Sequence, residues 1–133
     1  RQKVPASLVF LDLNKFKQIN DSFGHAEGDK ALMFFAEQLR QHYRESDLCA
    51  RLGGDEFVVL LTNTDIAQAN ELTKRLSAAL QASPLEASQD SAAAALYNLS
   101  FCHGAVEYDT QRHASIEHLL QAGDRLMYQG KKR

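Results

Sequence analysis

The sequence has few cysteines, no long apolar run and no excess of basic charge, and each shortage excludes a class of protein. Its two cysteines, Cys49 and Cys102, show no metal-type spacing. We expect both to be reduced core residues of a cytoplasmic protein. No stretch has the length of a membrane span or the pattern of a signal peptide. A formal net charge of −2 argues against binding of long nucleic acid, although an anionic small ligand needs only local positive charge.

The length favours a single domain. A chain of 133 residues can bury a real core but is too short for two domains. Hydrophobic residues make up 44% and charged residues 24%, as in ordinary soluble globular domains. The first strand-like run begins almost at once, and the sequence ends abruptly on KKR. We therefore expect one domain over residues 1–133, truncated at its N-terminal end and just after Lys131.

Apolar periodicity predicts the element order β, α, α, β, β, α, β, α. This order is typical of an α+β fold with a central, mostly antiparallel sheet flanked by helices. The Gly53-Gly54 hairpin is expected in the middle of the sheet, beside the end of the first strand. The stretch 83–95 is expected to be a loop or a poorly ordered connection. The expected strands are 7–13, 47–52, 56–62 and one within 95–108. The helical patterns are 14–29 (broken by Gly24 and Gly28), 32–43, 66–80 and 116–127.

The stretch ARLGGDEFVVLL, residues 50–61, places two adjacent acids before a buried strand. Adjacent carboxylates at such a rim repel each other and are costly to desolvate, so they need a partner. If the hairpin neighbours the first strand, Asp12 and Asp55 converge. Paired carboxylates of this kind suit Mg²⁺, which takes its other ligands from water and substrate phosphates.

Polar residues between the first strand and the next helix extend this site. Lys17 supplies a cation, and Asn20, His25 and Asp29 follow it. A carboxylate can accept from the N1 and N2 donors of guanine, and an amide can pair with its acceptors. The residues by themselves thus suggest a magnesium–nucleotide site that favours guanine.

The segments LDLNKFKQINDSFGHAEGD and RLGGDEF strongly resemble the GGDEF domain family, the diguanylate cyclases. The resemblance runs from about residue 6 to residue 131. It implies a fold like the palm of polymerases and class III nucleotide cyclases. It also implies condensation of two GTP molecules into cyclic di-GMP and two pyrophosphates by a homodimer that uses Mg²⁺, with Mn²⁺ as an alternative ion. The family further suggests an upstream sensory domain in the parent protein.

The resemblance assigns roles to individual residues. The metal ligands are expected to be Asp12, the Leu13 carbonyl and Asp55, and Asp55 is also the candidate base for the attacking 3′-hydroxyl. Glu56 is needed in the family and is expected to help hold a second cation. Gly53 and Gly54 are expected to let the nucleotide approach the backbone. The expected GTP contacts are Lys17, Asn20, His25, Asp29, Lys131, Gly53 and Gly54, and the expected catalytic residues are Asp55, Glu56 and Lys17.

A second motif, RESD at residues 44–47, stands where the family keeps an RxxD inhibitory site. Arg44 would stack on or fork to a guanine or phosphate, and Asp47 would read a guanine edge. Arg75 is the candidate second arginine. This assignment predicts feedback inhibition by cyclic di-GMP, relieved in Arg44→Ala without loss of initial rate.

Plainer interpretations exist for most of these residues. Asp12 and Asp55 could be solvated strand ends, and lysines are usually surface residues. Asn20 and Asp29 could be turn or cap residues, with Asp29 as an N-cap. RxxD alone is a common pattern, and only its distance from the double glycine gives it weight.

The sequence also departs from the family at several positions. Asn14 replaces a more usual Asp, CHG at 102–104 replaces SIG or SFG, and Gly123 and Gly130 replace alanines. The family's LTGLxNR-type segment before the first strand is missing here, and so is the arginine that the family is expected to carry a few residues past Lys131. A rival hypothesis is a catalytically weak GGDEF module that binds GTP or cyclic di-GMP as a regulatory sensor without making product, although the intact GGDEF letters favour the enzyme.

Overall fold

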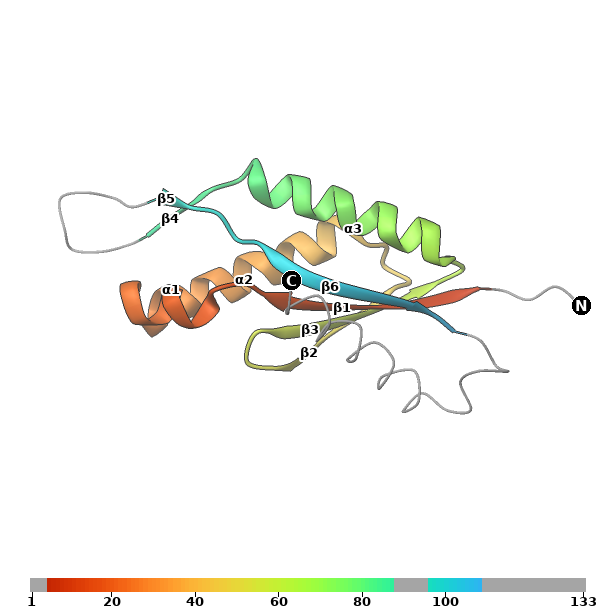
Figure 1. Ribbon diagram of the computed structural model, residues 1–133, viewed down its shortest axis with the longest axis horizontal. Coiled ribbons are helices and arrows are strands. Elements are labelled where there is room, and N and C mark those ends of the chain that lie inside the picture. Colours follow the sequence, from red (N-terminus) through yellow and green to blue (C-terminus); the bar gives the residue numbers. More distant parts are fainter. Residues whose placement is uncertain (1–4, 88–95, 109–133) are drawn as a thin grey trace, which may run out of the picture.

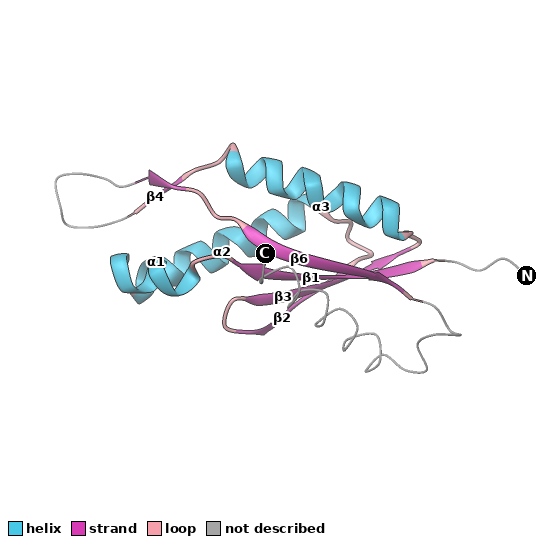
Figure 2. Ribbon diagram, in the orientation of Figure 1, coloured by secondary structure: helices cyan, strands magenta, loops and turns pink. Residues whose placement is uncertain are grey.

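The computed structural model describes residues 5–87 and 96–108, and this part forms an antiparallel sheet with helices packed on it (Figures 1 and 2). The α+β prediction is confirmed. The elements are β1 (Ala6–Leu13), α1 (Phe16–Phe23), α2 (His25–His42), β2 (Leu48–Gly53), β3 (Glu56–Thr62), α3 (Ile66–Gln81), β4 (Leu85–Glu86), β5 (Leu96–Tyr97) and β6 (Phe101–Glu107).

β1 is the central strand of the larger sheet. The strand order is β2-β3-β1-β6, and every neighbouring pair is antiparallel. Side chains alternate across β1, so Val9 and Leu11 enter the main core while Leu8 and Phe10 form a second cluster on the opposite face. Burial on both faces explains why SLVFLDL is an almost unbroken apolar run.

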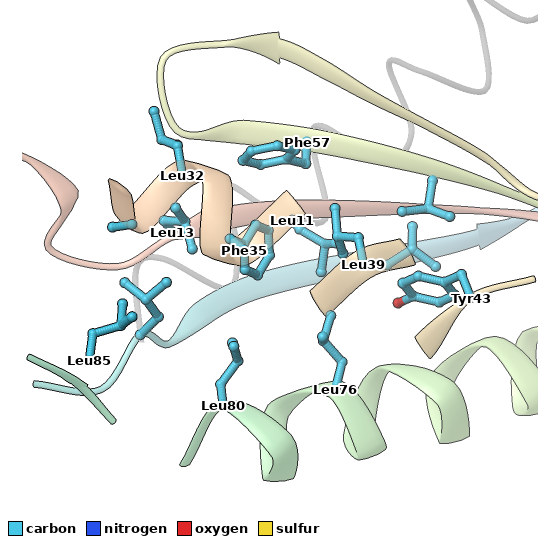
Figure 3. Packing of buried hydrophobic residues seen from close by; sticks show 14 of the residues in the cluster. Leu11, Leu13, Leu32, Phe35, Leu39, Tyr43, Phe57, Leu76, Leu80 and Leu85 are labelled. Carbon is cyan, nitrogen blue, oxygen red and sulfur yellow. The ribbon is translucent and has the colours of Figure 1, made fainter. Parts of the chain in front are cut away.

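The main core lies between the sheet and the helices α2 and α3. Phe35 and Leu39 of α2 and Leu76 of α3 project toward Leu11 and Phe57 of the sheet (Figure 3). The rings of Phe35 and Phe57 meet edge to face with centroids 5.0 Å apart. The start of α3 is fixed by a capping box between Asp65 and Gln68. The apolar spacing seen in the sequence therefore corresponds to the faces that these helices bury.

The second helix begins seven residues earlier than its apolar pattern predicts. α2 starts at His25, directly after Gly24, and continues through Gly28. Gly24 does break the helical pattern, because its φ of 93° lies in a region that favours glycine. Gly28 does not break it: a Cβ there would lie 1.8 Å from Asn20 Oδ1, so the glycine serves close packing of α1 against α2.

The predicted loop at 83–95 was wrong at its start. Leu85–Glu86 pairs with Leu96–Tyr97 to form the two-stranded β4–β5 ribbon. Leu85 and Ala87 are buried, and this burial favours an extended pairing that small-residue composition does not reveal. The strand expected within 95–108 is accordingly divided into β5 and β6.

The position of the hairpin was only partly predicted. β3 lies inside the sheet, but β2 is the edge strand of its described part and all its residues are exposed. Cys49 lies on β2 and is exposed, and Cys102 is half-buried, so the prediction of two core cysteines was wrong, although both thiols are free. The helix expected at 116–127 lies outside the described residues. None of the described helices combines the length and the apolarity that a membrane crossing requires.

Leu39 provides a test of the core. Leu39 and Met33 both lie on α2, but Leu39 is 1% exposed and Met33 is 72% exposed. We expect Leu39→Ala to lower the free energy of unfolding by about 2–5 kcal/mol, because it removes buried methyl groups and leaves a cavity. Met33→Ala should change it by less than about 0.5 kcal/mol. Urea unfolding measures both, and equal losses would contradict this account of the core.

Candidate functional site

The register between β1 and β3 brings the expected acids together. Asp12 pairs directly with Glu56, and the amide of Leu13 donates to the carbonyl oxygen of Asp55 at 3.1 Å. Asp12 is 2% exposed, whereas Asp55 and Glu56 are half-buried. Like charges directly opposite each other on neighbouring strands are destabilising. The end of β1 therefore concentrates negative charge at one half-buried place.

This donor set suits a hard divalent cation. Asp12, Asp55 and the Leu13 carbonyl offer the oxygen ligands that Mg²⁺ prefers, and Glu56 adds a nearby carboxylate. In the part of the chain that the structure describes, no group of three or more His, Cys, Asp or Glu side chains is arranged to hold a metal by itself. A partial protein set is compatible with Mg²⁺, which keeps waters and takes further ligands from substrate phosphates.

The double glycine forms the turn that carries Asp55 to this place. Gly54 has a φ of 47°, a left-handed conformation that few residues other than glycine adopt readily. Arg51 Nε donates to the Gly54 carbonyl at 2.8 Å and holds the turn on its outer side. A Cβ at Gly53 or Gly54 would meet nothing within 4 Å. The turn itself thus accounts for Gly54, and the space around it is open.

The expected nucleotide residues lie on α1 and on the start of α2. Lys17, His25 and Asp29 are exposed and Asn20 is half-buried. Asn20 packs against Gly28, which immediately precedes Asp29. Asn20 therefore lies against the residue that precedes Asp29, although nine positions separate Asn20 from Asp29. Asp29 is not an N-cap, because α2 begins four residues before it. Lys131 lies outside the described residues.

A buried acid next to this pair was missed by sequence reasoning. Glu27 is 3% exposed and accepts a hydrogen bond from the hydroxyl of Tyr97 on β5. Lys30 Nζ lies 3.3 Å from the same carboxylate and also donates to the Glu86 carbonyl on β4. No pattern in the sequence connects Glu27 with Tyr97, which are 70 positions apart. The packing of the β4–β5 ribbon on α1 and α2 brings them together.

The RxxD residues form a network within the chain. Asp47 accepts hydrogen bonds from the Arg44 and Thr62 amides at 2.9 and 3.2 Å, and its side chain is 0% exposed. The Arg44 guanidinium contacts Asp47, the Thr62 carbonyl and Thr64 Oγ1, yet remains 52% exposed. Arg44 is therefore available to a ligand, whereas the Asp47 carboxylate is committed to holding the loop.

The third expected inhibitory residue, Arg75, is exposed on α3. The structure links its surroundings to the RxxD loop through Tyr43, whose hydroxyl lies 3.4 Å from Thr73 Oγ1. Burial raises the pKa of Tyr43 to about 12, against the lowering effect of the Thr73 hydrogen bond, so this phenol stays protonated. The loop that carries Arg44 and the helix that carries Arg75 are thus joined by a buried contact.

Asn14, the departure from the family's second Asp, has a packing role. Its Nδ2 donates to Ser100 Oγ at 3.0 Å, and Cys102 Sγ donates to its Oδ1 at 3.2 Å. These contacts connect the end of β1 to the start of β6. Asn14 therefore fits the interpretation that this position does not require a metal-binding carboxylate.

Comparisons with known proteins agree with the fold and the motifs. The family model "Diguanylate cyclase, GGDEF domain" matches residues 1–133. The chain is 49% identical over 77 residues to the diguanylate cyclase DgcP of Pseudomonas aeruginosa, covering 58% of this chain and 12% of DgcP. It is 32% identical over 133 residues to the diguanylate cyclase DosC of Escherichia coli, covering 100% of this chain and 28% of DosC.

A solved structure gives the same result. The GGDEF domain of TpbB from Pseudomonas aeruginosa is 36% identical with a TM-score of 0.85, over 96% of this chain and 72% of that one. The chain spans only 12–28% of the length of the two curated relatives above. GGDEF diguanylate cyclases generally depend on a divalent metal ion. With a family match over all 133 residues, the chain belongs to the diguanylate cyclase GGDEF domain family.

Proposed function

We propose that this domain is a diguanylate cyclase that condenses two GTP molecules into cyclic di-GMP and two pyrophosphates. The observation that carries the proposal is the β1–β3 register, which sets Asp12 opposite Glu56 and beside the Asp55 backbone. Family membership and the two curated cyclases among its relatives support the same activity. Because GTP is a cytoplasmic nucleotide, the proposal places the domain in the cytoplasm.

In this mechanism the protein mainly positions substrate and balances charge. Asp12, Asp55 and the Leu13 carbonyl would hold Mg²⁺, with Mn²⁺ as an alternative, and Glu56 would help hold a second cation. When bound, the metal neutralises triphosphate charge and stabilises the attacking and leaving oxygens. Asp55 accepts the proton of the attacking 3′-hydroxyl.

Substrate recognition is assigned to the helical part of the site. Asn20 and Asp29 read the guanine edge, with His25 in the same region. Lys17 binds the triphosphate, helped by Lys131 from outside the described residues. Gly53 and Gly54 leave the nucleotide room beside the turn. Each domain holds one GTP, so two domains must face each other, and an upstream sensory domain would control that encounter.

Product inhibition is the second part of the proposal. Arg44 is half-exposed and held by Asp47, so its guanidinium is oriented before any ligand arrives. Arg75 supplies the second cation. The buried Asp47 carboxylate is better suited to positioning Arg44 than to reading guanine directly.

Asp55 gives the test of the enzyme. Asp55→Ala should reduce cyclic di-GMP formation from GTP and Mg²⁺ by on the order of 100-fold or more, because it removes both a metal ligand and the base. Asp21→Ala, an exposed acid of α1, is the matched control and should leave the rate unchanged. Product is quantified by chromatography on the chain and on a longer parent protein. GTP binding without product from the wild-type proteins would instead support the regulatory module.

Substitutions of Arg44 and Arg75 distinguish a loss of product inhibition from a loss of stability. Arg75→Ala should raise the cyclic di-GMP concentration for half-inhibition several-fold and change the free energy of unfolding by less than about 0.5 kcal/mol. Arg44→Ala should raise it as well, but should cost about 1–3 kcal/mol because the buried Asp47 carboxylate loses a charged hydrogen-bond partner and the Thr62 carbonyl loses a donor. Inhibition curves and urea unfolding measure these effects. Unchanged inhibition in both variants would reject the inhibitory site.

A further inference from the structure

The β4–β5 ribbon touches both helices that carry the expected guanine residues. Tyr97 of β5 stacks its ring on Phe23, the last residue of α1, with centroids 5.6 Å apart and an interplanar angle of 21°. The hydroxyl of the same side chain donates to Glu27 in the first turn of α2. One residue of the ribbon therefore spans the junction between the two helices.

That junction needs an external support. A single residue, Gly24, separates α1 from α2, and its φ of 93° places it in a region that favours glycine. The N-terminus of α2 has no side-chain cap. The angle between the helices therefore depends on side-chain contacts across the junction, and those of Tyr97 lie immediately beside it.

The angle matters because the two residues proposed to read guanine lie on different helices, Asn20 on α1 and Asp29 on α2. Asn20 lies three residues before Phe23, one turn away on α1, and Asp29 lies two residues after Glu27. The close approach of Asn20 to Gly28 leaves no room for a side chain between α1 and α2 at this point. A small rotation of α1 on α2 would change the separation of the Asn20 amide and the Asp29 carboxylate.

The contact between Tyr97 and Glu27 has a geometry that is restrained by several interactions. The Glu27 carboxylate is buried and satisfied by the Tyr97 hydroxyl and the Lys30 ammonium together. Burial, followed by the Glu27 hydrogen bond, raises the pKa of Tyr97 well above its usual range, so the phenol remains the donor. Lys30 also bonds the Glu86 carbonyl and ties the same acid to β4. A hydrogen bond to a buried charge is stronger and more directional than one between neutral groups.

We propose that Tyr97 and Glu27 are positioning residues of the guanine site, which set the spacing of Asn20 and Asp29 by clamping α1 to α2. The inference rests on the proposed function, because it assumes that these two residues read guanine. Tyr97 and Glu27 do not contact the substrate. They act through the angle of the helices that do.

Tyr97→Phe is the decisive variant, because it keeps the ring stack on Phe23 and removes only the donor to Glu27. We expect the KM for GTP to rise about 5- to 20-fold with kcat within about twofold, as for a loss of binding common to ground and transition states. The preference for GTP over ITP, which lacks the N2 amino group, should fall several-fold. Glu27→Gln, which keeps an acceptor for the phenol but loses the charge, should have a smaller effect in the same direction.

Asn98→Ala is the matched control. Asn98 Nδ2 bonds the Leu80 and Gln81 carbonyls at 3.0 and 2.9 Å, so it anchors the chain after β5 to α3 and not to α1 or α2. This variant should shift the urea midpoint but leave the KM and the GTP:ITP ratio unchanged. If Tyr97→Phe and Glu27→Gln behave like the control, the residues are only structural and the inference is overturned.

The outcomes separate this inference from the proposed function. Wild-type protein that makes cyclic di-GMP while Tyr97→Phe keeps its KM and nucleotide preference contradicts the inference alone. If the wild type makes no product but binds GTP, the cyclase fails, and calorimetric Kd values for GTP and ITP in both proteins decide the inference. Wild-type protein that binds no GTP overturns both.

Discussion

The pairing of β1 with β3 is the constraint on which the site depends. The register that buries Leu11 and Phe57 on one face also sets Asp12 opposite Glu56 at the strand ends. A slip by one residue would turn the core side chains outward and would also change which residue lies opposite Asp12. The hydrophobic pattern of the strands therefore fixes the geometry of the charged rim, and like charges can be held there because the core specifies the register.

The sequence predicted the parts of this arrangement that depend on local pattern. The apolar runs of β1 and β3, the helical faces of α2 and α3 and the turn at Gly53-Gly54 all carry such a signal. The β4–β5 ribbon escaped prediction because two-residue strands are too short to show a period. Gly28 was misinterpreted because its role depends on the approach of Asn20, a tertiary contact. Cys49 was predicted to lie in the core because its strand contains several apolar residues, although all residues of this edge strand are exposed.

Asp47 shows that a motif expected to bind a ligand can also stabilise the fold. The sequence suggested that Asp47 contacts a ligand. In the structure its carboxylate is buried and accepts a hydrogen bond from the amide of Thr62 at the end of β3. The same network reaches Thr64, whose amide donates to the Pro5 carbonyl before β1. The loop that carries Arg44 is thus joined to the point where the chain enters the sheet. Substitutions there cannot be interpreted as losses of ligand contacts alone, since each also removes a structural bond.

The two halves of the proposed site are held by different means. The acids at the strand ends are fixed by backbone pairing, which tolerates many side-chain changes as long as the register is kept. The helices that carry Asn20 and Asp29 meet at a glycine, and Tyr97 of the β4–β5 ribbon contacts both of them, through Phe23 on α1 and Glu27 on α2. Metal and phosphate chemistry depends on charge at one place, whereas reading a base edge depends on the spacing of two groups. Under the proposed function, base recognition is therefore expected to be more sensitive to remote substitutions than metal binding, and the Glu27–Tyr97 contact is where we expect this sensitivity to be greatest.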